Sequence, residues 1–214
     1  MKLAEKSERL KNMSEEELNA RHAEKMKKKK AARDKIIATK TIEKGLVIVH
    51  TGKGKGKSTA GFGMVFRAIG NGMRVGIVQF VKGKWETGER KVLEAFPEQV
   101  EFATMGEGFT WETQDRQRDI EAAKGAWEKA RVMIMDEKLD LVLLDELNIV
   151  LRYDYLDVNN VIGFLKTKPE MKHVIVTGRN AKDELIEFAD LVTEMEMIKH
   201  PFRSGVKAQV GIEF

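Results

Sequence analysis

Residues 51–59, TGKGKGKST, combine closely spaced glycines with lysines and hydroxyl side chains. The apolar run LVIV (46–49) precedes this segment, and the helix-competent stretch AGFGMVFRAIG (60–70) follows it. A strand, a glycine-rich turn and a helix in this order form a loop whose backbone N–H groups and helix dipole attract phosphate. The sequence therefore predicts that the triphosphate of MgATP binds a cradle formed by Gly52, Lys53, Gly54, Lys55, Gly56, Lys57, Ser58 and Thr59.

Two side chains of this loop have predicted roles of their own. Lys57 would reach the terminal phosphates, and Ser58 would offer its hydroxyl to Mg²⁺. Thr51 stands where the usual G-x-x-x-x-G-K-[ST] pattern begins with glycine. The alternative is a lysine- and glycine-rich turn without a ligand, and the strand before the loop and the helix after it argue against that alternative.

A second group of candidate residues ends the apolar run LDLVLLDEL (139–147). Asp145 and Glu146 follow this buried-strand pattern directly, so they are expected at the edge of the sheet where the phosphate loop lies. Carboxylates suit Mg²⁺ or its water ligands, and the sequence does not decide which of the two serves the metal. The alternative is an acidic strand end that caps the next helix.

The elements that must position these residues alternate between short apolar runs and longer helical stretches, which indicates βαβ units. We predict an α/β fold of the P-loop, RecA-like kind, with a mainly parallel sheet flanked by helices. The expected strands are 46–49, 75–81, 100–105, 139–146, 173–178, 191–198 and 207–214. The expected helices are 58–70, 88–96, 115–136, 157–167 and 181–189.

The net charge of +4 is unevenly distributed along the 214 residues. Residues 1–44 contain 14 Lys/Arg against 8 Asp/Glu, whereas residues 45–214 contain 24 against 26. We therefore expect a basic N-terminal helical segment (1–44) and a nucleotide-binding catalytic domain (45–214). Ser14 and Glu17 have capping-box spacing, which predicts a helix from about Glu15 to Lys35. The Lys27–Lys30 run fits a solvated helix face, and no nucleic-acid partner is expected.

Composition restricts the class of protein further. The chain has no cysteine, which excludes a disulfide framework, a thiolate metal site and a catalytic thiol. No apolar run approaches the roughly 20 residues of a membrane-spanning helix. The first ten residues, MKLAEKSERL, have charged side chains where an export signal would have its apolar stretch. We expect a cytoplasmic protein without a membrane partner.

From about residue 21 onward the sequence resembles the corrinoid adenosyltransferases of the type that has a P-loop. Each shared segment is weak alone, but together, in this order and spacing, they are highly specific. The segments are TGKGKGKST with the same Thr51, VQFVKGKWETGE (78–89), MGEGFTW (105–111), LLDELN (143–148), VTGRNA (176–181) and HPFRSGVKAQVGIEF (200–214).

The resemblance implies that the 5′-deoxyadenosyl group of ATP is transferred to the cobalt(I) of a corrinoid, releasing tripolyphosphate. The corrinoid would be cob(I)alamin or cobyrinic acid a,c-diamide, in adenosylcobalamin biosynthesis or salvage. A separate corrinoid reductase or flavoprotein would supply cobalt(I). The family is homodimeric, and its N-terminal segment can cover the active site, so residues 1–44 are a candidate cover.

The resemblance also assigns residues by position. Lys57, Ser58 and Glu146 would bind the triphosphate and Mg²⁺. Phe109 and Trp111 match an aromatic pair that crowds the lower face of the corrin and helps keep cobalt without its lower ligand. The residues alone leave it open whether this pair packs into the core instead. Further candidates for nucleotide contact are Arg67 and Arg179.

Two other functions use the same motifs. A phosphotransferase or ATPase would use the loop to activate phosphoryl transfer, with Asp145 or Glu146 orienting a hydroxyl or water, and it would form ADP. A non-enzymatic or motor-type nucleotide-dependent module could use the basic N-terminus on nucleic acid, and its binding would depend on salt.

Overall fold

The computed structural model describes residues 13–81, 88–104 and 115–213. The chain divides into two units, Met1–Glu43 and Lys44–Phe214, and each is described by itself. Within the described ranges, no helix combines the length and the apolar character that crossing a membrane requires.

The N-terminal unit contains one described helix, α2 (Glu15–Ala38), and none of its residues is buried. The predicted capping box is present, because the Ser14 hydroxyl accepts from the Glu17 N–H and the Glu17 carboxylate accepts from the Ser14 N–H. The helix thus begins where the sequence predicts and ends three residues later than Lys35. Because no face of α2 is apolar, local capping rather than core packing defines it.

The second unit is built on a six-stranded parallel sheet with the strand order β3-β2-β4-β5-β1-β6. The fold class predicted from the sequence is confirmed. Strand β5 separates β1, which leads into the phosphate loop, from β4, which ends in the acidic pair. The strands are β1 (Val47–Thr51), β2 (Val75–Gln79), β3 (Val100–Thr104), β4 (Leu141–Asp145), β5 (His173–Thr177) and β6 (Leu191–Glu194).

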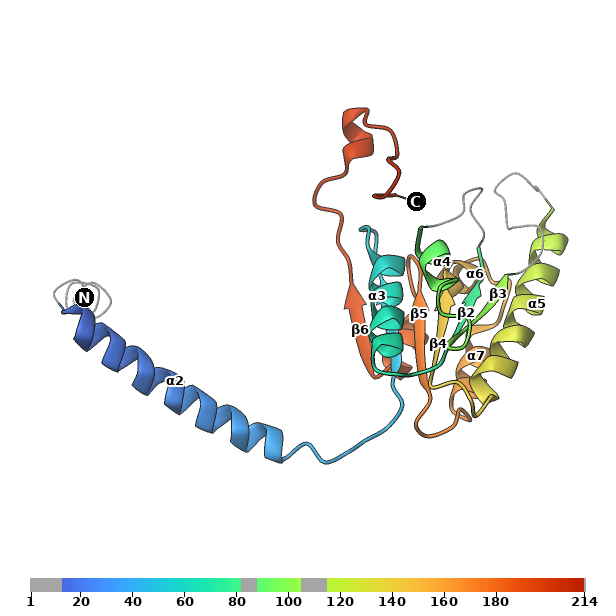
Figure 1. The fold of residues 1–214 in the computed structure, drawn as a ribbon. Coiled ribbons are helices and arrows are strands. Elements are labelled where there is room, and N and C mark those ends of the chain that lie inside the picture. The colour runs from blue at the N-terminus through green and yellow to red at the C-terminus, as the bar shows by residue number, and fades with distance from the viewer. Residues whose placement is uncertain (1–12, 82–87, 105–114, 214) are drawn as a thin grey trace. The chain divides into compact units, whose positions relative to one another are not determined.

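Helices cover both faces of this sheet (Figure 1). Buried side chains of α3 (Lys57–Gly70) and α4 (Gly88–Leu93) pack on one face. The other face is covered by α5 (Arg116–Met135), α6 (Leu147–Arg152), α7 (Val158–Leu165) and α8 (Asp183–Phe188). A short 3₁₀ helix, η1 (Pro201–Ser204), lies in the C-terminal segment.

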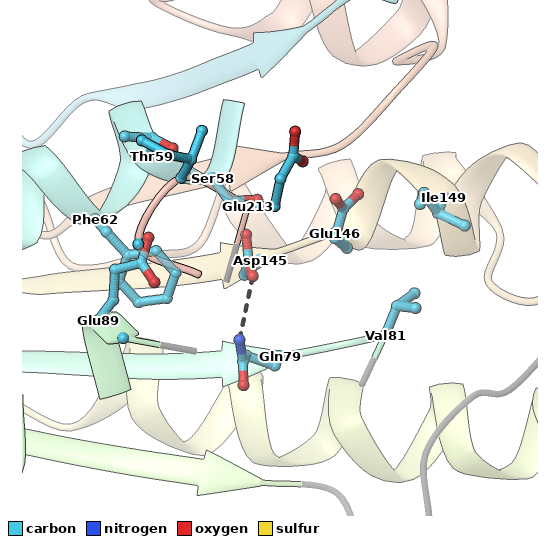
Figure 2. A pocket seen from close by; sticks show the side chains of 13 residues that line it. Ser58, Thr59, Phe62, Gln79, Val81, Glu89, Asp145, Glu146, Ile149 and Glu213 are labelled. Atoms are coloured by element: carbon cyan, nitrogen blue, oxygen red, sulfur yellow. Dashed lines mark hydrogen bonds between the residues drawn. The ribbon is translucent and has the colours of Figure 1, made fainter. Parts of the chain in front are cut away.

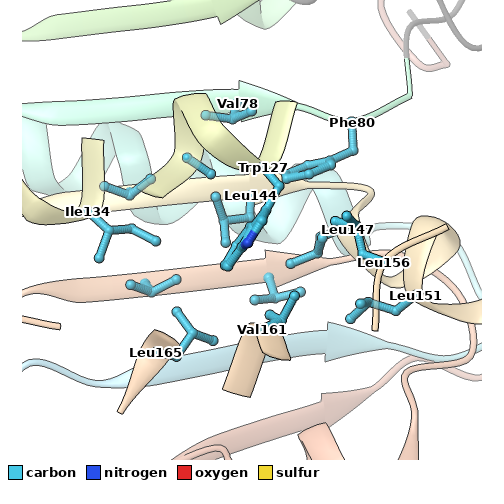
Figure 3. Packing of buried hydrophobic residues seen from close by; sticks show 14 of the residues in the cluster. Val78, Phe80, Trp127, Ile134, Leu144, Leu147, Leu151, Leu156, Val161 and Leu165 are labelled. Atoms are coloured by element: carbon cyan, nitrogen blue, oxygen red, sulfur yellow. The ribbon is translucent and has the colours of Figure 1, made fainter. Parts of the chain in front are cut away.

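The larger core cluster lies between the sheet and α5 to α8 (Figure 3). Trp127 of α5 packs beside Leu144 of β4 and makes an edge-to-face contact with Phe164 at 5.6 Å between ring centroids. Strands β1 and β4 are buried along their whole length. A parallel strand covered on both faces needs a continuous apolar run, which is why the sequence predicted these strands well.

The C-terminal strand predicted at 207–214 is wrong, because residues 207–209 have no regular structure and residues 210–213 form a turn. The strand predicted at 191–198 ends at Glu194. Apolar and polar residues alternate at the C-terminus, but Val210 and Ile212 are 83% and 79% exposed, so no second layer buries them. Gly205 and Gly211 also adopt positive φ values of 77° and 78°, which interrupts an extended chain. The sequence also missed the short helix α6.

Candidate functional site

A pocket of about 500 Å³ opens at the carboxyl ends of the strands, beside the start of α3 (Figure 2). In parallel α/β sheets, ligands bind at this end. The phosphate loop, the ends of β2 and β4, helix α4 and the C-terminal segment all contribute to its wall. The lining residues are Ser58, Thr59, Phe62, Gln79, Val81, Gly88, Glu89, Asp145, Glu146, Ile149, Gly211, Ile212 and Glu213.

The phosphate loop depends on glycine for two different reasons. Gly52 and Gly56 have φ values of 98° and 100°, in the left-handed region, and Gly56 is the N-cap of α3. Gly54 needs to lack a side chain because a Cβ there would lie 2.5 Å from the Glu196 carbonyl oxygen. The Gly54 N–H also donates to the Met195 carbonyl at 2.6 Å. The chain that leaves β6 therefore supports the loop from one side.

Lys57 is the buried cation of the loop, with 6% of its surface exposed. Its ammonium donates to the Gly54 carbonyl oxygen across the turn. Burial lowers the pKa of Lys57, nearby Arg179 and Lys55 lower it further, and Glu146 opposes them. The structure thus places a buried ammonium inside the loop, and its contact with phosphate oxygens stays a prediction.

The remaining loop side chains lie at the surface or at the pocket. Lys53, Lys55 and Thr59 are exposed, and Thr59 lines the pocket together with Ser58. Lys55 forms an ion pair with the Glu213 carboxylate of the C-terminal segment. Glu213 thus reaches back to the phosphate loop from the end of the chain (Figure 2).

Asp145 is buried at the end of β4 and receives three side-chain hydrogen bonds. The Thr177 hydroxyl donates at 2.7 Å, and the Gln79 amide donates at 3.4 Å. The Ser58 side chain is the third partner. Burial raises the pKa of Asp145 despite these bonds. The carboxylate of Asp145 therefore connects β4 to the predicted metal-binding hydroxyl of the loop.

Glu146 follows with a left-handed backbone, φ 63°, and its N–H donates to the Thr177 hydroxyl at 2.9 Å. Its Oε2 is buried and has no hydrogen-bond partner in the described part of the chain. Burial and the neighbouring Asp145 raise the pKa of Glu146 to about 7, against the opposing effect of Lys57 and Arg179. A buried carboxylate oxygen without a donor is suited to a cation that arrives with the ligand.

Mg²⁺ fits this donor set. Ser58 supplies a hydroxyl next to Asp145, and Glu146 supplies the free carboxylate oxygen. Among the described residues there is no group of three or more acidic, His or Cys side chains that could hold a metal ion alone. Mg²⁺ in nucleotide enzymes is bound by one or two carboxylates together with substrate phosphates and water, so a smaller protein donor set is what this ion requires.

The four other predicted site residues differ in their placement. Arg179, in the turn after β5, lies close enough to Lys57 and Glu146 to shift the pKa of both. Arg67 is exposed in the last turn of α3, about 15 Å along the helix axis from Lys57 by helix rise. Arg67 does not line the pocket, so a nucleotide contact by it stays a prediction. Phe109 and Trp111 lie outside the described residues.

Three polar side chains that bond to predicted site residues were not themselves predicted from the sequence. Thr177 contacts both acidic residues, Gln79 donates to Asp145, and Glu213 pairs with Lys55. Thr177 and Gln79 each end a strand next to β4. A polar residue at the end of an expected parallel strand is the sequence feature that could have identified both. Nothing in the local pattern around Glu213 indicates where the C-terminal segment returns.

The fold and the site together define a P-loop nucleotide-binding α/β protein. The family model described as ATP:corrinoid adenosyltransferase BtuR/CobO/CobP matches residues 43–214, and the model for the N-terminal part of cob(I)alamin adenosyltransferase matches residues 13–37. The chain belongs to this family of transferases, which adenosylate corrinoids with ATP.

Curated relatives agree over most of the chain. A corrinoid adenosyltransferase of Sinorhizobium sp. is 67% identical over 92% of each chain. Those of Pseudomonas aeruginosa and Escherichia coli K12 are 52% and 46% identical, over 92% and 91% of this chain and 98% of their own. The resemblance predicted from the sequence is confirmed.

Proposed function

We propose that this protein transfers the 5′-deoxyadenosyl group of ATP to the cobalt(I) of a corrinoid and releases the triphosphate intact. The electron pair of cobalt(I) forms a bond to C5′, the C5′–O bond breaks, and its electron pair leaves on the triphosphate oxygen. Cobalt becomes formally cobalt(III) in the alkylated product. No proton moves in this step, so no general acid or base is required.

The observation that supports this proposal is the position of Lys57. It is buried in the phosphate loop next to Glu146 and Arg179, and the loop belongs to a chain of the adenosyltransferase family. Cationic and N–H groups that hold the phosphates stabilise the negative charge that develops on a leaving triphosphate. Holding the phosphates also fixes C5′ relative to an incoming nucleophile, which is a proximity effect.

Mg²⁺ would be held by Ser58 and Glu146, with Asp145 orienting the Ser58 side chain. When bound, the ion neutralises charge on the triphosphate and so makes it a better leaving group. Asp145 is tied to Thr177, Gln79 and Ser58, whereas Glu146 keeps a free oxygen. We therefore assign the direct metal contact to Glu146 rather than to Asp145.

Several further parts of the proposal rest on the family resemblance. Phe109 and Trp111 would face the corrin and exclude a lower ligand, so that cobalt(I) stays a strong nucleophile. The substrate would be cob(I)alamin or cobyrinic acid a,c-diamide, and a separate reductase or flavoprotein would supply cobalt(I). A homodimer, a cover role for residues 1–44 and a cytoplasmic location stay predictions as well.

Product analysis tests the proposal. ATP, Mg²⁺, the protein and chemically reduced corrinoid are incubated without oxygen. The expected products are tripolyphosphate and a light-sensitive cobalt–carbon compound in equal amounts, with ATP left uncleaved when the corrinoid is oxidised. Stoichiometric ADP without alkylated corrinoid would refute the proposal and favour a phosphotransferase or ATPase.

A further inference from the structure

The turn Gly178–Ala181 connects β5 to the segment before α8 and contains Arg179. Two of its residues have positive φ values, 127° at Gly178 and 53° at Asn180. Left-handed backbone at a residue other than glycine persists only where the surroundings hold it. Both ends of this turn are fixed by hydrogen bonds to other elements, and Arg179 lies between the two attachment points.

Thr51 makes the first attachment. It is buried at the end of β1, and its hydroxyl accepts from the Ala181 N–H at 2.8 Å. Its backbone carbonyl accepts from the Met195 N–H at 2.9 Å. Glycine, which the usual phosphate-loop pattern has at this position, could not make the hydroxyl bond. The departure at Thr51 therefore has a structural consequence, which is a direct link from the phosphate loop to the turn after β5.

Asn148 makes the second attachment from the start of α6. Its side chain is fully buried, and its amide nitrogen donates to the Gly178 carbonyl oxygen at 3.1 Å. A Cβ at Gly178 would lie 2.9 Å from the Asn148 Cβ and 3.0 Å from the Glu146 Oε2. Asn148, Gly178 and the free carboxylate oxygen thus lie against one another, which fixes the turn relative to the acidic end of β4.

We infer that Thr51 and Asn148 are positioning residues, which hold the Gly178–Ala181 turn so that the Arg179 guanidinium faces the triphosphate bound at Lys57. Arg179 is exposed, so side-chain packing does not hold it. Its proximity to Lys57 and Glu146 is set by the backbone of the turn. The inference rests on the proposed function only in that the loop binds MgATP.

A double-mutant cycle on MgATP binding tests this inference. The dissociation constant is measured for the full chain without corrinoid, so the result does not depend on which bond of ATP breaks. Arg179→Ala is expected to weaken binding about 10- to 100-fold, the range for a charge-assisted contact. Thr51→Val, which keeps the shape but removes the hydroxyl, is expected to weaken it about 3- to 10-fold.

The decisive comparison is Thr51→Val in the Arg179→Ala background, where we expect less than about a twofold further loss because the two act through one contact. Thr51→Ser keeps a hydroxyl and should restore most of the affinity. Thr193→Val removes a threonine hydroxyl from exposed Thr193 on neighbouring β6 and should leave affinity unchanged.

Two outcomes would overturn the inference. An equal loss from Thr51→Val with and without Arg179 would mean that the hydroxyl acts on the phosphate loop itself. Unchanged affinity in Arg179→Ala would mean that the turn makes no nucleotide contact. If Thr51→Val folds poorly, Asn148→Ala is the second variant. It too should cause less than about a twofold further loss of affinity in the Arg179→Ala background. A failed product analysis together with a coupled cycle would refute the proposed reaction and leave this inference standing.

Discussion

The two halves of the site are built in different ways. The phosphate loop is one contiguous segment, residues 51–59, with Lys57 as its buried charge. The phosphate ligands proposed for such a loop are mostly backbone N–H donors. The edge formed by β4 and β5 is assembled from side chains about 30 residues apart, in which Thr177 bonds to both Asp145 and Glu146. The loop half is therefore encoded locally, whereas the edge half depends on which strands are neighbours.

Substitutions in the two halves should therefore have different effects on activity and stability. A substitution of Lys57 in the loop would remove a group that we propose to contact the phosphates directly. A substitution at the edge also changes the energy of the nucleotide-free protein, because the acidic residues there are buried close together. A loop substitution should accordingly lower activity without changing stability, whereas a substitution at the edge should change both.

The largest effect is expected from Lys57→Ala, which should lower turnover by about 10³-fold or more, as for the loss of a key charge-stabilising donor. The protein should stay folded, because Lys57 contacts loop backbone and not the apolar core. Steady-state kinetics and circular dichroism measure the two properties. Lys124→Ala, at an exposed position of α5, is the control. Wild-type turnover in Lys57→Ala would remove the phosphate loop from the mechanism.

Glu146→Gln should lower activity by about 10- to 100-fold through weaker metal binding and should also change stability. The pKa of Glu146 is about 7 in the folded chain, above its ordinary 4.5. The folded state therefore binds the proton more tightly than the unfolded state, so stability falls as pH rises from about 4.5 to 7.

Glutamine cannot ionise, so this decline should become shallower in the variant. Without nucleotide, Glu146→Gln is expected to be more stable than the wild type at pH 8, by of order 1–3 kcal/mol. Denaturant unfolding at pH 5 and pH 8 measures the change. A variant less stable than the wild type at pH 8 would show that the ionised carboxylate stabilises the fold. That result would contradict the expectation from its buried oxygen, which has no hydrogen-bond partner in the described part of the chain.

Replacing both Phe109 and Trp111 with alanine should lower activity by of order tenfold or more toward a corrinoid that must lose its lower ligand. ATP affinity should stay within a fewfold of the wild type, because the proposed role of the pair is on the corrin. Parallel measurements of ATP binding and of corrinoid turnover separate the two effects. Collapse of ATP binding would instead make the pair structural.

The smallest effect is expected from Glu213→Gln. The Glu213 carboxylate pairs with Lys55, and loss of this pair frees a loop lysine for phosphate. ATP affinity should rise by about two- to fivefold, since a partly exposed ion pair contributes at most about 1 kcal/mol. Calorimetric titration at low and high salt measures it. A weaker affinity would show that Glu213 supports the bound nucleotide directly.

The sequence predicted the parts that depend on neighbouring residues. The loop, the buried strands and the acidic pair all follow from contiguous patterns. Thr177 and Asn148 were not predicted to act, because their roles depend on the register that places Leu144 beside Val176. The strand predicted at 207–214 failed because alternation alone does not supply a neighbouring strand, and the path of Glu213 to Lys55 is a tertiary contact without a local pattern.

The central claim is that both halves of the site hold the triphosphate as an intact leaving group, and an ATP analogue with a nitrogen between the β- and γ-phosphorus tests it most directly. This β,γ-imido analogue resists cleavage at the γ-phosphorus but keeps the C5′–O bond. With Mg²⁺ and reduced corrinoid, we predict adenosylated corrinoid and intact imidotriphosphate in equal amounts. An analogue that binds and inhibits without alkylating the corrinoid, while ATP yields ADP, would contradict the claim.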